Sequence, residues 1–340
     1  MQGKFEHISI RGILSAVPVN EVDNNDYISK IQSRRVKKQI ALTGIDRRRV
    51  TSTGQKASDM ATVAAEKLLD QLKWQRDEID VVVFVTQSGD LVRPSSALLI
   101  QNRLGLHKEC MAYDINQGCA GYISGLTTIC SILQVTKGKG LLLVGESNAI
   151  AGDDIAAGAL LEGDAAAATA IEYCENAEAI DFANYCDGSR ADYLYKPFDG
   201  PAYMDGNAVL LFGLSDVADT VKDFMKNKHI ANEDIDYYVF HQAQKMIVDG
   251  IVQEVGIPSE KVFMSCQSFG NTSSASLPLT ICLEKEQRNL SGKKRLLLCG
   301  YGIGLAWGII MLDVDMDVVL PIIETDYIYD DRKKFSGGGK

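Results

Sequence analysis

The chain has 340 residues, 46% of them hydrophobic, and a formal net charge of −10 at pH 7. This length is typical of two domains or one large domain, and the ordinary composition excludes a disordered or fibrous protein. The acidic balance argues against nucleic acid as the main partner. The apolar runs are short, so we expect no membrane span, and the first residues lack a signal-peptide pattern.

The eight cysteines are scattered, and none belongs to a C-x-x-C pair. Neither a disulfide framework nor a zinc site is therefore indicated. We expect a soluble enzyme of a reducing compartment, the cytoplasm, that uses neither a metal ion nor a bound cofactor.

Helix-like and strand-like segments alternate along the chain. Apolar residues at three- and four-residue spacing predict a helix over residues 59–71, and a β-rich run over residues 79–85 follows it. A strand over residues 110–114 precedes small residues that begin a helix running to about Gln134. The other strands expected in this half cover residues 141–144 and 165–171.

The second half of the chain echoes the first. The Ile-Asp that begins the run at residues 79–85 returns at residues 235–236, again before a β-rich run and after a helix-like segment over residues 219–228. Leu-Leu-Leu-Val-Gly at residues 141–145 returns as Leu-Leu-Leu-Cys-Gly at residues 296–300, at nearly the same offset. Two matches at nearly one offset indicate a duplicated α/β unit.

We therefore predict an α/β fold of two similar halves, each with a mostly buried sheet of short strands. The expected division is residues 1–175, residues 176–315 and a C-terminal extension, residues 316–340. Open α/β sheets bind ligands at the carboxyl ends of their strands, and duplicated halves bring such ends face to face. Residues at matching strand ends can therefore converge on one crevice.

Cys119 lies among small residues at the start of a predicted helix. The positive end of the helix dipole is expected to lower the pKa of its thiol below the free value of about 8.5. A buried structural cysteine is the commoner fate of this residue type, and for Cys119 taken alone the two interpretations are equally supported. The other seven cysteines, including Cys299 inside an apolar strand, are interpreted as structural.

The chain has only four histidines, and His241 alone directly follows a buried strand. Asn271 occupies the place in the second half that Cys119 occupies in the first. The alternatives are a core histidine and a helix-cap or turn asparagine, a position that Asn favours. Together with Cys119, a functional interpretation of both is favoured. The Gly-rich stretch at residues 300–308 lacks the lysine of a phosphate loop, and a turn that presents a backbone N–H fits it better.

Several segments, in order, resemble β-ketoacyl-acyl-carrier-protein synthase III, a family of thiolase-fold condensing enzymes. They are DINQGCAGYISGL at 114–126, HQAQ at 241–244, GNTSSAS at 270–276 and GYGIGLAWG at 300–308, with support from TGIDRRR at 43–49 and GDAAAA at 163–168. The resemblance covers nearly the whole chain. It implies a layered αβαβα arrangement of the two halves.

The resemblance also implies a triad of Cys119, His241 and Asn271. Cys119 would take an acyl group from a thioester, and a second thioester, usually malonyl on a carrier protein, would lose CO₂. The enolate would be held by His241 and Asn271, and backbone N–H groups of Cys119 and Ile303 would form an oxyanion hole. The implied partners are acyl-CoA, acyl carrier protein and a second copy of the chain in a homodimer.

Several positions depart from the family pattern. The tryptophan and arginine that sandwich the adenine of coenzyme A in the family fall at Lys38 and Leu42, although basic residues cluster nearby. This cluster is either a solvated face or a contact for phosphate or a carrier protein. Arg93 stands where the family usually has an apolar residue that reaches across the dimer into the partner's acyl pocket. The expected substrate-binding residues are Lys38, Arg47, Arg48, Arg93 and Lys245.

Arg93 would either pair with a carboxylate or another polar group of an acyl chain or point to solvent. HQAQ replaces a usual HQAN, and Ile303 replaces a usual Gly, which indicates a specialised family member. Decarboxylative condensation is the leading function. Acyl transfer to an oxygen, nitrogen or sulfur nucleophile uses the same Cys119 and stays open. A thiolase, or an inactive subunit of a heterodimer, is less well supported, since Cys299 falls on a strand and the triad is intact.

Overall fold

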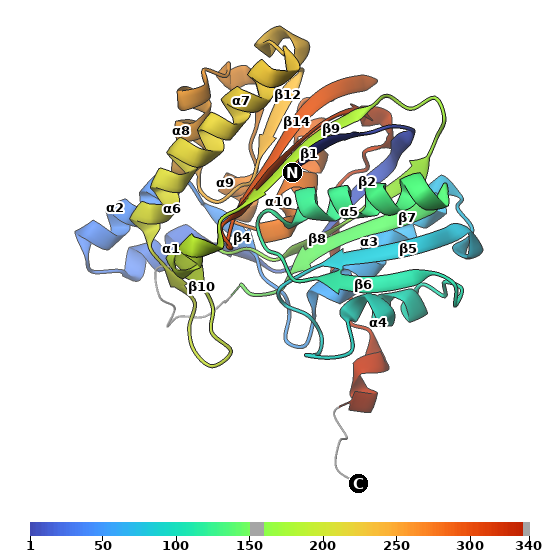
Figure 1. Cartoon of the computed structure of the whole chain (residues 1–340). Helices are drawn as coiled ribbons and strands as arrows, with labels where there is room; N and C mark the ends of the chain where they lie inside the picture. Colours follow the sequence, from blue (N-terminus) through green and yellow to red (C-terminus); the bar gives the residue numbers. More distant parts are fainter. Residues whose placement is uncertain (150–159, 336–340) are drawn as a thin grey trace.

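The computed structural model describes residues 1–149 and 160–335, which form two six-stranded sheets with helices between and outside them (Figure 1). The first sheet contains, from edge to edge, β16 (Ile323–Thr325), β2 (Ile8–Pro18), β8 (Ala165–Tyr173), β7 (Lys139–Glu146), β5 (Ile79–Val85) and β6 (Met111–Ile115). The second contains β1 (Gln2–Phe5), β9 (Ile180–Cys186), β15 (Ala306–Asp315), β14 (Lys293–Gly302), β12 (Tyr237–Phe240) and β13 (Val262–Phe263). Two small ribbons pair β3 (Glu21–Asp23) with β4 (Arg47–Arg49) and β10 (Leu194–Tyr195) with β11 (Tyr203–Met204).

The two sheets repeat each other almost strand for strand. In each sheet one strand, β5 or β12, lies parallel to both of its neighbours. The next two strands then pair antiparallel, β7 with β8 and β8 with β2 in one sheet, β14 with β15 and β15 with β9 in the other. The repeats of the sequence at residues 141–145 and 296–300 fall on β7 and β14, which occupy the same place in the two sheets. The expected α/β fold with duplicated halves is confirmed.

Each terminal segment adds a strand to the sheet of the opposite half of the chain. The N-terminal strand β1 joins the second sheet, antiparallel to β9, and β16 from the C-terminal extension joins the first sheet, parallel to β2. The division expected at residues 175 and 315 therefore does not coincide with the sheets at the two termini.

Helices form three layers around the sheets (Figure 1). The central layer is α5 (Gly121–Thr136) and α10 (Ser276–Gln287), the layer outside the first sheet is α3 (Ala57–Leu72) and α4 (Ser96–Arg103), and the layer outside the second is α7 (Ala218–Lys228) and α8 (Lys245–Val255). Three clusters of buried apolar side chains lie at these interfaces, and the central cluster draws on both sheets. The remaining α-helices of the described residues are α1 (Asn24–Lys30), α2 (Arg34–Thr43), α6 (Gly206–Phe212) and α9 (Cys266–Phe269).

Burial on both faces explains the sequence of the inner elements. β5 reads Ile-Asp-Val-Val-Val-Phe-Val and is buried at every position except the aspartate, as expected for a strand covered by helices on both faces. The central helix α5 is apolar on most sides because it packs between two sheets. A Cβ at Gly125 would lie 2.6 Å from Leu142 Cδ1, so glycine allows α5 to lie close to β7. No helix in the described residues is long and apolar enough to cross a membrane.

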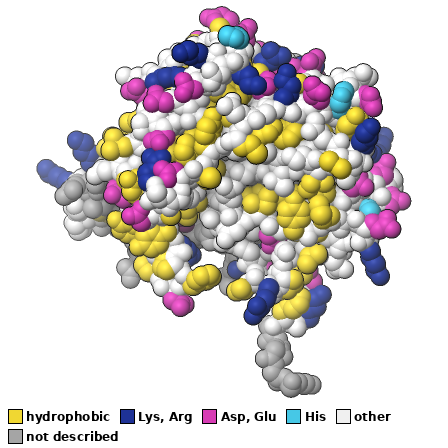
Figure 2. Space-filling model, in the orientation of Figure 1, with side chains coloured by type: hydrophobic (Ala, Val, Ile, Leu, Met, Phe, Trp, Pro, Cys, Tyr) yellow, Lys and Arg dark blue, Asp and Glu magenta, His cyan; other side chains and the backbone are white. Residues whose placement is uncertain are grey.

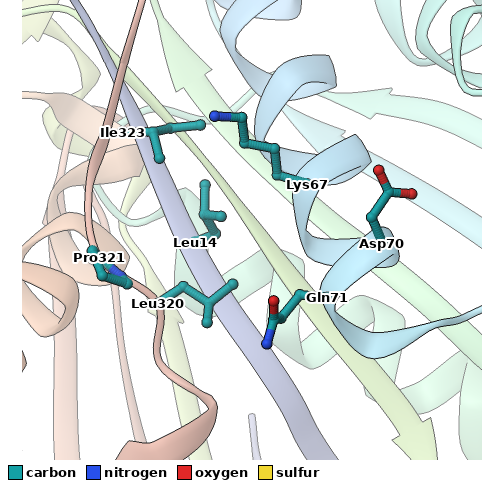
Figure 3. A pocket seen from close by; sticks show the side chains of 7 residues that line it. All are labelled: Leu14, Lys67, Asp70, Gln71, Leu320, Pro321 and Ile323. Carbon is teal, nitrogen blue, oxygen red and sulfur yellow. The ribbon is translucent and has the colours of Figure 1, made fainter.

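The C-terminal extension packs on the first sheet. Val319 is buried, and Leu320 N donates to Ile13 O at 2.8 Å. A shallow pocket separates this segment from α3, with Leu14 at its floor (Figure 3). Its lining residues are Leu14, Lys67, Asp70, Gln71, Leu320, Pro321 and Ile323. None is a candidate catalytic residue, so the functional site lies elsewhere. Residues 336–340, the last part of the predicted extension, lie outside the described residues.

Candidate active site

Cys119 lies in the turn between β6 and α5, one residue before the N-cap of α5, Ala120. The backbone N–H groups of Ile303 and of Cys119 itself hydrogen-bond to the sulfur. A Cβ at Gly302 would lie 2.6 Å from Cys119 Cβ and 3.0 Å from Cys119 Sγ, so only glycine permits this close approach. The Gly-rich turn therefore brings a backbone N–H to the sulfur.

His241 follows β12 and is 1% exposed. Its Nδ1 lies 2.8 Å from Ser276 Oγ, and the Tyr301 hydroxyl donates to its backbone carbonyl at 3.1 Å. The Tyr301 ring lies edge-on to the imidazole, 5.4 Å between centroids. Burial lowers the pKa of His241 to about 3, although the backbone carbonyl of Ser273 opposes this shift. The imidazole is therefore neutral near pH 7.

Asn271 is fixed by its backbone and by its side chain. Its N–H donates to Leu161 O at 2.7 Å, and its carbonyl accepts from Gly163 N at 3.0 Å. Its Oδ1 accepts from Ser273 N at 2.9 Å. The amide Nδ2 is then the polar group of this side chain that can donate to a substrate oxygen.

Ser273 connects the three candidate residues. Its hydroxyl lies 4.0 Å from Cys119 Sγ, its N–H donates to Asn271, and its carbonyl hydrogen-bonds to His241. Ser273 adopts a φ of 50°, which is uncommon outside glycine. In this conformation its hydroxyl, its N–H and its carbonyl face three different residues. The structure thus gathers Cys119, His241 and Asn271 around one residue. The sequence analysis missed Ser273, although it belongs to the same GNTSSAS motif as Asn271.

Comparisons with known proteins agree with this arrangement. A family model described as 3-oxoacyl-[acyl-carrier-protein (ACP)] synthase III matches residues 113–188, and the model of its C-terminal part matches residues 225–314. A Clostridium perfringens protein named β-ketoacyl-[acyl-carrier-protein] synthase III is 33% identical over 284 residues, which are 78% of this chain and 87% of that protein. The chain belongs to the β-ketoacyl-acyl-carrier-protein synthase III family.

Solved structures confirm the thiolase fold of this synthase III family member. The crystal structure of 3-oxoacyl-(acyl-carrier protein) synthase from Burkholderia xenovorans LB400 has a TM-score of 0.89 at 30% identity and covers 96% of this chain and 99% of that one. Cerulenin-bound OleA of Xanthomonas campestris has a TM-score of 0.81 at 23% identity, covers 91% of this chain and 97% of its own, and supports the fold alone. As its family predicts, the protein is a condensing enzyme of the transferase class.

The pKa of the Cys119 thiol differs from the prediction for this synthase. Burial raises it to about 11, and the hydrogen bonds from Ser273 and Ile303 only partly oppose the shift. The charge of Glu146, a buried carboxyl group, raises it further. This raised pKa contradicts the expectation of a depressed one, and its largest cause is the desolvation of the thiolate.

Glu146 is a functional neighbour that the sequence analysis missed. It ends β7, is 3% exposed, and accepts a hydrogen bond from Gln87 N at 2.9 Å. Burial raises its pKa to about 7. Gln87 in turn lies against Gly118, where a Cβ would meet its Oε1 at 2.5 Å. Glu146 therefore fixes the backbone of Gln87, whose side chain packs against Gly118, the residue before Cys119.

Alkylation of Cys119 in this enzyme is expected to follow its raised pKa. The rate constant with iodoacetamide should rise roughly tenfold per pH unit from pH 7 to pH 10, without levelling off, because only the thiolate reacts. Mass spectrometry of the peptide that contains Cys119 measures the rate separately from the exposed Cys186. A plateau below pH 8.5 would show that the helix N-terminus, rather than burial, dominates the pKa.

The structure corrects the prediction for Arg48. Its side chain is fully buried, and it donates from Nε to Asn24 Oδ1 at 2.8 Å and from Nη1 to Glu162 O at 2.9 Å. Burial lowers its pKa from the ordinary value. Alternation along β4 points Arg48 inward and leaves Arg47 exposed. Arg48 therefore stabilises the core beneath Gly270 and is not available to bind phosphate.

The remaining basic candidates separate into two places. Lys38 is exposed on α2, which packs against α8, and Lys245 begins α8 and lies against Gly44. Arg47 is exposed and pairs with Glu21 at 3.5 Å. Figure 2 shows basic side chains at the left edge, where α2 lies in Figure 1. These three residues belong to one side of the molecule.

Arg93 lies elsewhere, in the loop that joins β5 to α4. Its side chain is exposed, and within the described residues it makes no hydrogen bond or ion pair. The structure therefore does not bring Arg93 together with Lys38 and Lys245.

Proposed function

We propose that Cys119 accepts an acyl group from a thioester and that the enzyme condenses this group with a malonyl thioester. The thiolate of Cys119 attacks the acyl carbonyl, and the N–H groups of Cys119 and Ile303 stabilise the tetrahedral oxyanion. The thiolate of coenzyme A or of a carrier then leaves and takes up the proton that the Cys119 thiol has given up. The observation that carries the proposal is the contact of Ser273 with Cys119, His241 and Asn271.

The second half of the reaction uses neutral donors. The bond to the malonyl carboxylate breaks, CO₂ leaves, and the electron pair forms an enolate whose oxygen is held by His241 and Asn271. A His241 pKa of about 3 keeps the imidazole neutral over the working pH range, so its single N–H donates to the enolate oxygen in place of the Ser273 carbonyl. The enolate carbon attacks the acyl carbonyl, and the bond to the Cys119 sulfur breaks. Acyl transfer to another nucleophile would need Cys119 but not the enolate site.

Intact-mass spectrometry tests the proposal. Purified protein is exposed to a panel of acyl-CoA and acyl-carrier thioesters, beside the Cys119→Ala variant. We expect an acyl adduct that the variant lacks and that is discharged when malonyl thioester is added, with release of CO₂.

Other outcomes distinguish the alternatives. Discharge by a non-malonyl nucleophile assigns the protein to simple acyl transfer. No adduct with any donor contradicts the proposal and favours an inactive subunit.

The exposed basic residues are proposed to bind the phosphates of the thioester. Lys38, Arg47 and Lys245 lie on the side of Asn271, because Gln267, four residues before it, bonds to Asp46 at 2.8 Å through their side chains. Local positive charge on an acidic protein steers anionic ligands. In the mass assay, Lys245→Glu should raise the acyl-CoA concentration that gives half-maximal acylation, and an unchanged value would exclude its role.

We also propose a homodimer formed through β6. No strand in the described part of the chain pairs with the outer edge of β6, and Met111 on β6 and Leu98 on the neighbouring helix α4 are exposed. An unpaired edge strand with apolar neighbours favours pairing with another chain, here a second copy. Sedimentation equilibrium should give twice the mass of one chain. All eight cysteines are free, which fits the proposed cytoplasmic, reducing location.

The dimer gives Arg93 a role in choosing the acyl group. From the loop beside β6, Arg93 is proposed to enter the acyl pocket of the partner and to pair with a carboxylate on the acyl chain. We expect the enzyme to be acylated faster by succinyl-CoA than by butyryl-CoA, which has the same chain length without the charge. Arg93→Phe should reverse that order by roughly tenfold or more, as for the loss of a charge-assisted hydrogen bond. An unchanged preference would mean that Arg93 points to solvent.

A further inference from the structure

The C-terminal segment reaches α3 and α4 after it leaves the first sheet. Gln55 Nε2 donates to Thr325 O at 2.9 Å, and Tyr329 N donates to Asp59 Oδ1 at 3.2 Å. The described part of the segment ends in a short 3₁₀ helix, η9 (Asp330–Phe335), which lies below α4 in Figure 1. The match to the C-terminal family model stops at residue 314, so this segment is an addition to the matched part.

Two arginines and three aspartates, here called the arginine–aspartate cluster, meet where this segment docks: Asp59, Asp90, Arg103, Asp331 and Arg332. Arg332 donates to the two carboxylate oxygens of Asp59 at 2.6 Å each and to Asp90 Oδ1 at 2.9 Å. Arg103 donates to the two oxygens of Asp331 at 2.9 Å each. The side chains of Asp59 and Asp90 are 0% exposed, and that of Arg103 is 2% exposed.

Asp90 takes its nearest cation from the C-terminal segment. Arg332 Nη1 lies 2.9 Å from Asp90 Oδ1, whereas Arg103 Nη2 lies 3.9 Å away. Asp90 Oδ2 is buried and has no hydrogen-bond partner among the described residues. A buried carboxylate without a close cation is strongly unfavourable. Burial opposes the charge of Arg332, but Asp59 and Asp90 outweigh it and raise the pKa of the guanidinium, which stays charged.

Asp90 lies in the middle of the loop over residues 86–95, which joins β5 to α4. The loop begins close to Cys119, since Gln87 lies against Gly118, and it contains Arg93. At its start, Gln87 is held by Glu146, and at its end Ser96 Oγ accepts from Asp90 N at 2.9 Å. Between Asp90 and Ser96 the chain projects, with Val92 fully exposed. Arg332 therefore fixes the side chain of Asp90, three residues before Arg93.

We propose that the C-terminal segment positions the 86–95 loop through the arginine–aspartate cluster, with Arg332 as the positioning residue, and so sets how well Arg93 holds a carboxylate-bearing acyl group. The effect on the acyl group rests on the function proposed above, while the effect on the loop does not. Arg332 contacts neither Cys119 nor substrate and acts through Asp90.

Hydrogen–deuterium exchange of the full-length protein tests the positioning directly. In Arg332→Gln, amides of peptides covering residues 86–95 should exchange roughly tenfold faster than in the wild type, because a buried carboxylate loses its cation. Arg332→Lys keeps the positive charge but not the bidentate hydrogen bonding, and it should restore in part the protection of these amides from exchange. Lys333→Gln is the matched control, because Lys333 is 77% exposed in the same segment and pairs with the exposed Asp330.

A second variant distinguishes loss of the Arg332–Asp90 contact from general unfolding. Asn at position 90 has no charge to compensate, so Arg332→Gln should accelerate exchange less in an Asp90→Asn background than in the wild type. Equal acceleration in both backgrounds, or no acceleration of the 86–95 peptides in Arg332→Gln, overturns the proposal.

Kinetics test the consequence for the substrate. Arg332→Gln should raise the KM for succinyl-CoA about threefold or more, with little change for butyryl-CoA and none in the alkylation rate of Cys119 by iodoacetamide. An equal rise for both donors would overturn the link to Arg93. If the wild type forms no adduct with any donor, the proposed function fails, but the exchange experiment still decides whether Arg332 holds the loop.

Discussion

Replacement of Gly302 by alanine is expected to lower kcat for condensation by roughly 10²- to 10³-fold, the effect typical of losing one oxyanion donor. The added Cβ would lie 2.6 Å from Cys119 Cβ, closer than two such carbons approach in proteins. Either Cys119 or the turn must move, and the N–H of Ile303 then no longer faces the sulfur and the adjoining acyl carbonyl. Single-turnover acylation, followed by intact mass, measures the loss at the first chemical step.

Gly188→Ala is the matched control for this variant. Gly188 is exposed at the start of a short 3₁₀ helix, η3 (Gly188–Tyr193), and an added Cβ there meets no atom within 4 Å. We expect its acylation rate to equal that of the wild type. Wild-type acylation in Gly302→Ala would show that the turn is not part of the oxyanion site.

The features that the sequence predicted well depend on local patterns. Apolar runs and three- and four-residue spacing gave α3, β5 and α7 at nearly their observed positions. The small residues around Cys119 marked the turn between β6 and α5, whereas Asn271 follows the short helix α9 rather than a strand. The repeat at residues 141–145 and 296–300 was sufficient to align the halves.

The features that the sequence did not predict depend on packing between distant segments. Arg48 belongs to a basic run that is typical of a solvated face, yet it meets Glu162, 114 positions away, in the core. The pKa of Cys119 depends on its burial among residues far away in the sequence, such as Ser273 and Ile303, and the sequence around Cys119 does not show this burial. Ser273 acquires its role only because three separate segments meet at it. Arg332 and Asp59, 273 positions apart, show the same limit.

Replacement of Arg103 by methionine is expected to lower the free energy of unfolding by roughly 3–5 kcal/mol, as for other buried ion pairs that lose one partner. Arg103 is 2% exposed, and it donates to Asp331 and to Ser58 Oγ. Methionine fills much of the space but leaves Asp331 without its hydrogen-bonded cation and leaves Asp59 and Asp90 with Arg332 as their close cation. Denaturant unfolding followed by circular dichroism measures the change.

Arg76→Met is the control for this prediction, because Arg76 forms an exposed ion pair with Asp70 at 2.9 Å. Such surface pairs contribute only about 0–1 kcal/mol. Equal destabilisation by the two variants would mean that the cluster is no stronger than a surface pair.

The same cluster predicts the sign of a pH effect. Burial opposes ionisation of Asp331, but the hydrogen bonds and charge of Arg103 outweigh it and lower the pKa of Asp331 below the ordinary value of 3.8. A depressed carboxyl pKa contributes stability that is complete above the ordinary value and is lost as the pH falls through the folded-state value. Arg103→Met removes the main cause of this depression. The variant should therefore lose less stability than the wild type as the pH falls below about 4, and a parallel loss in both proteins would contradict the assignment of Arg103 as the partner that keeps Asp331 ionised.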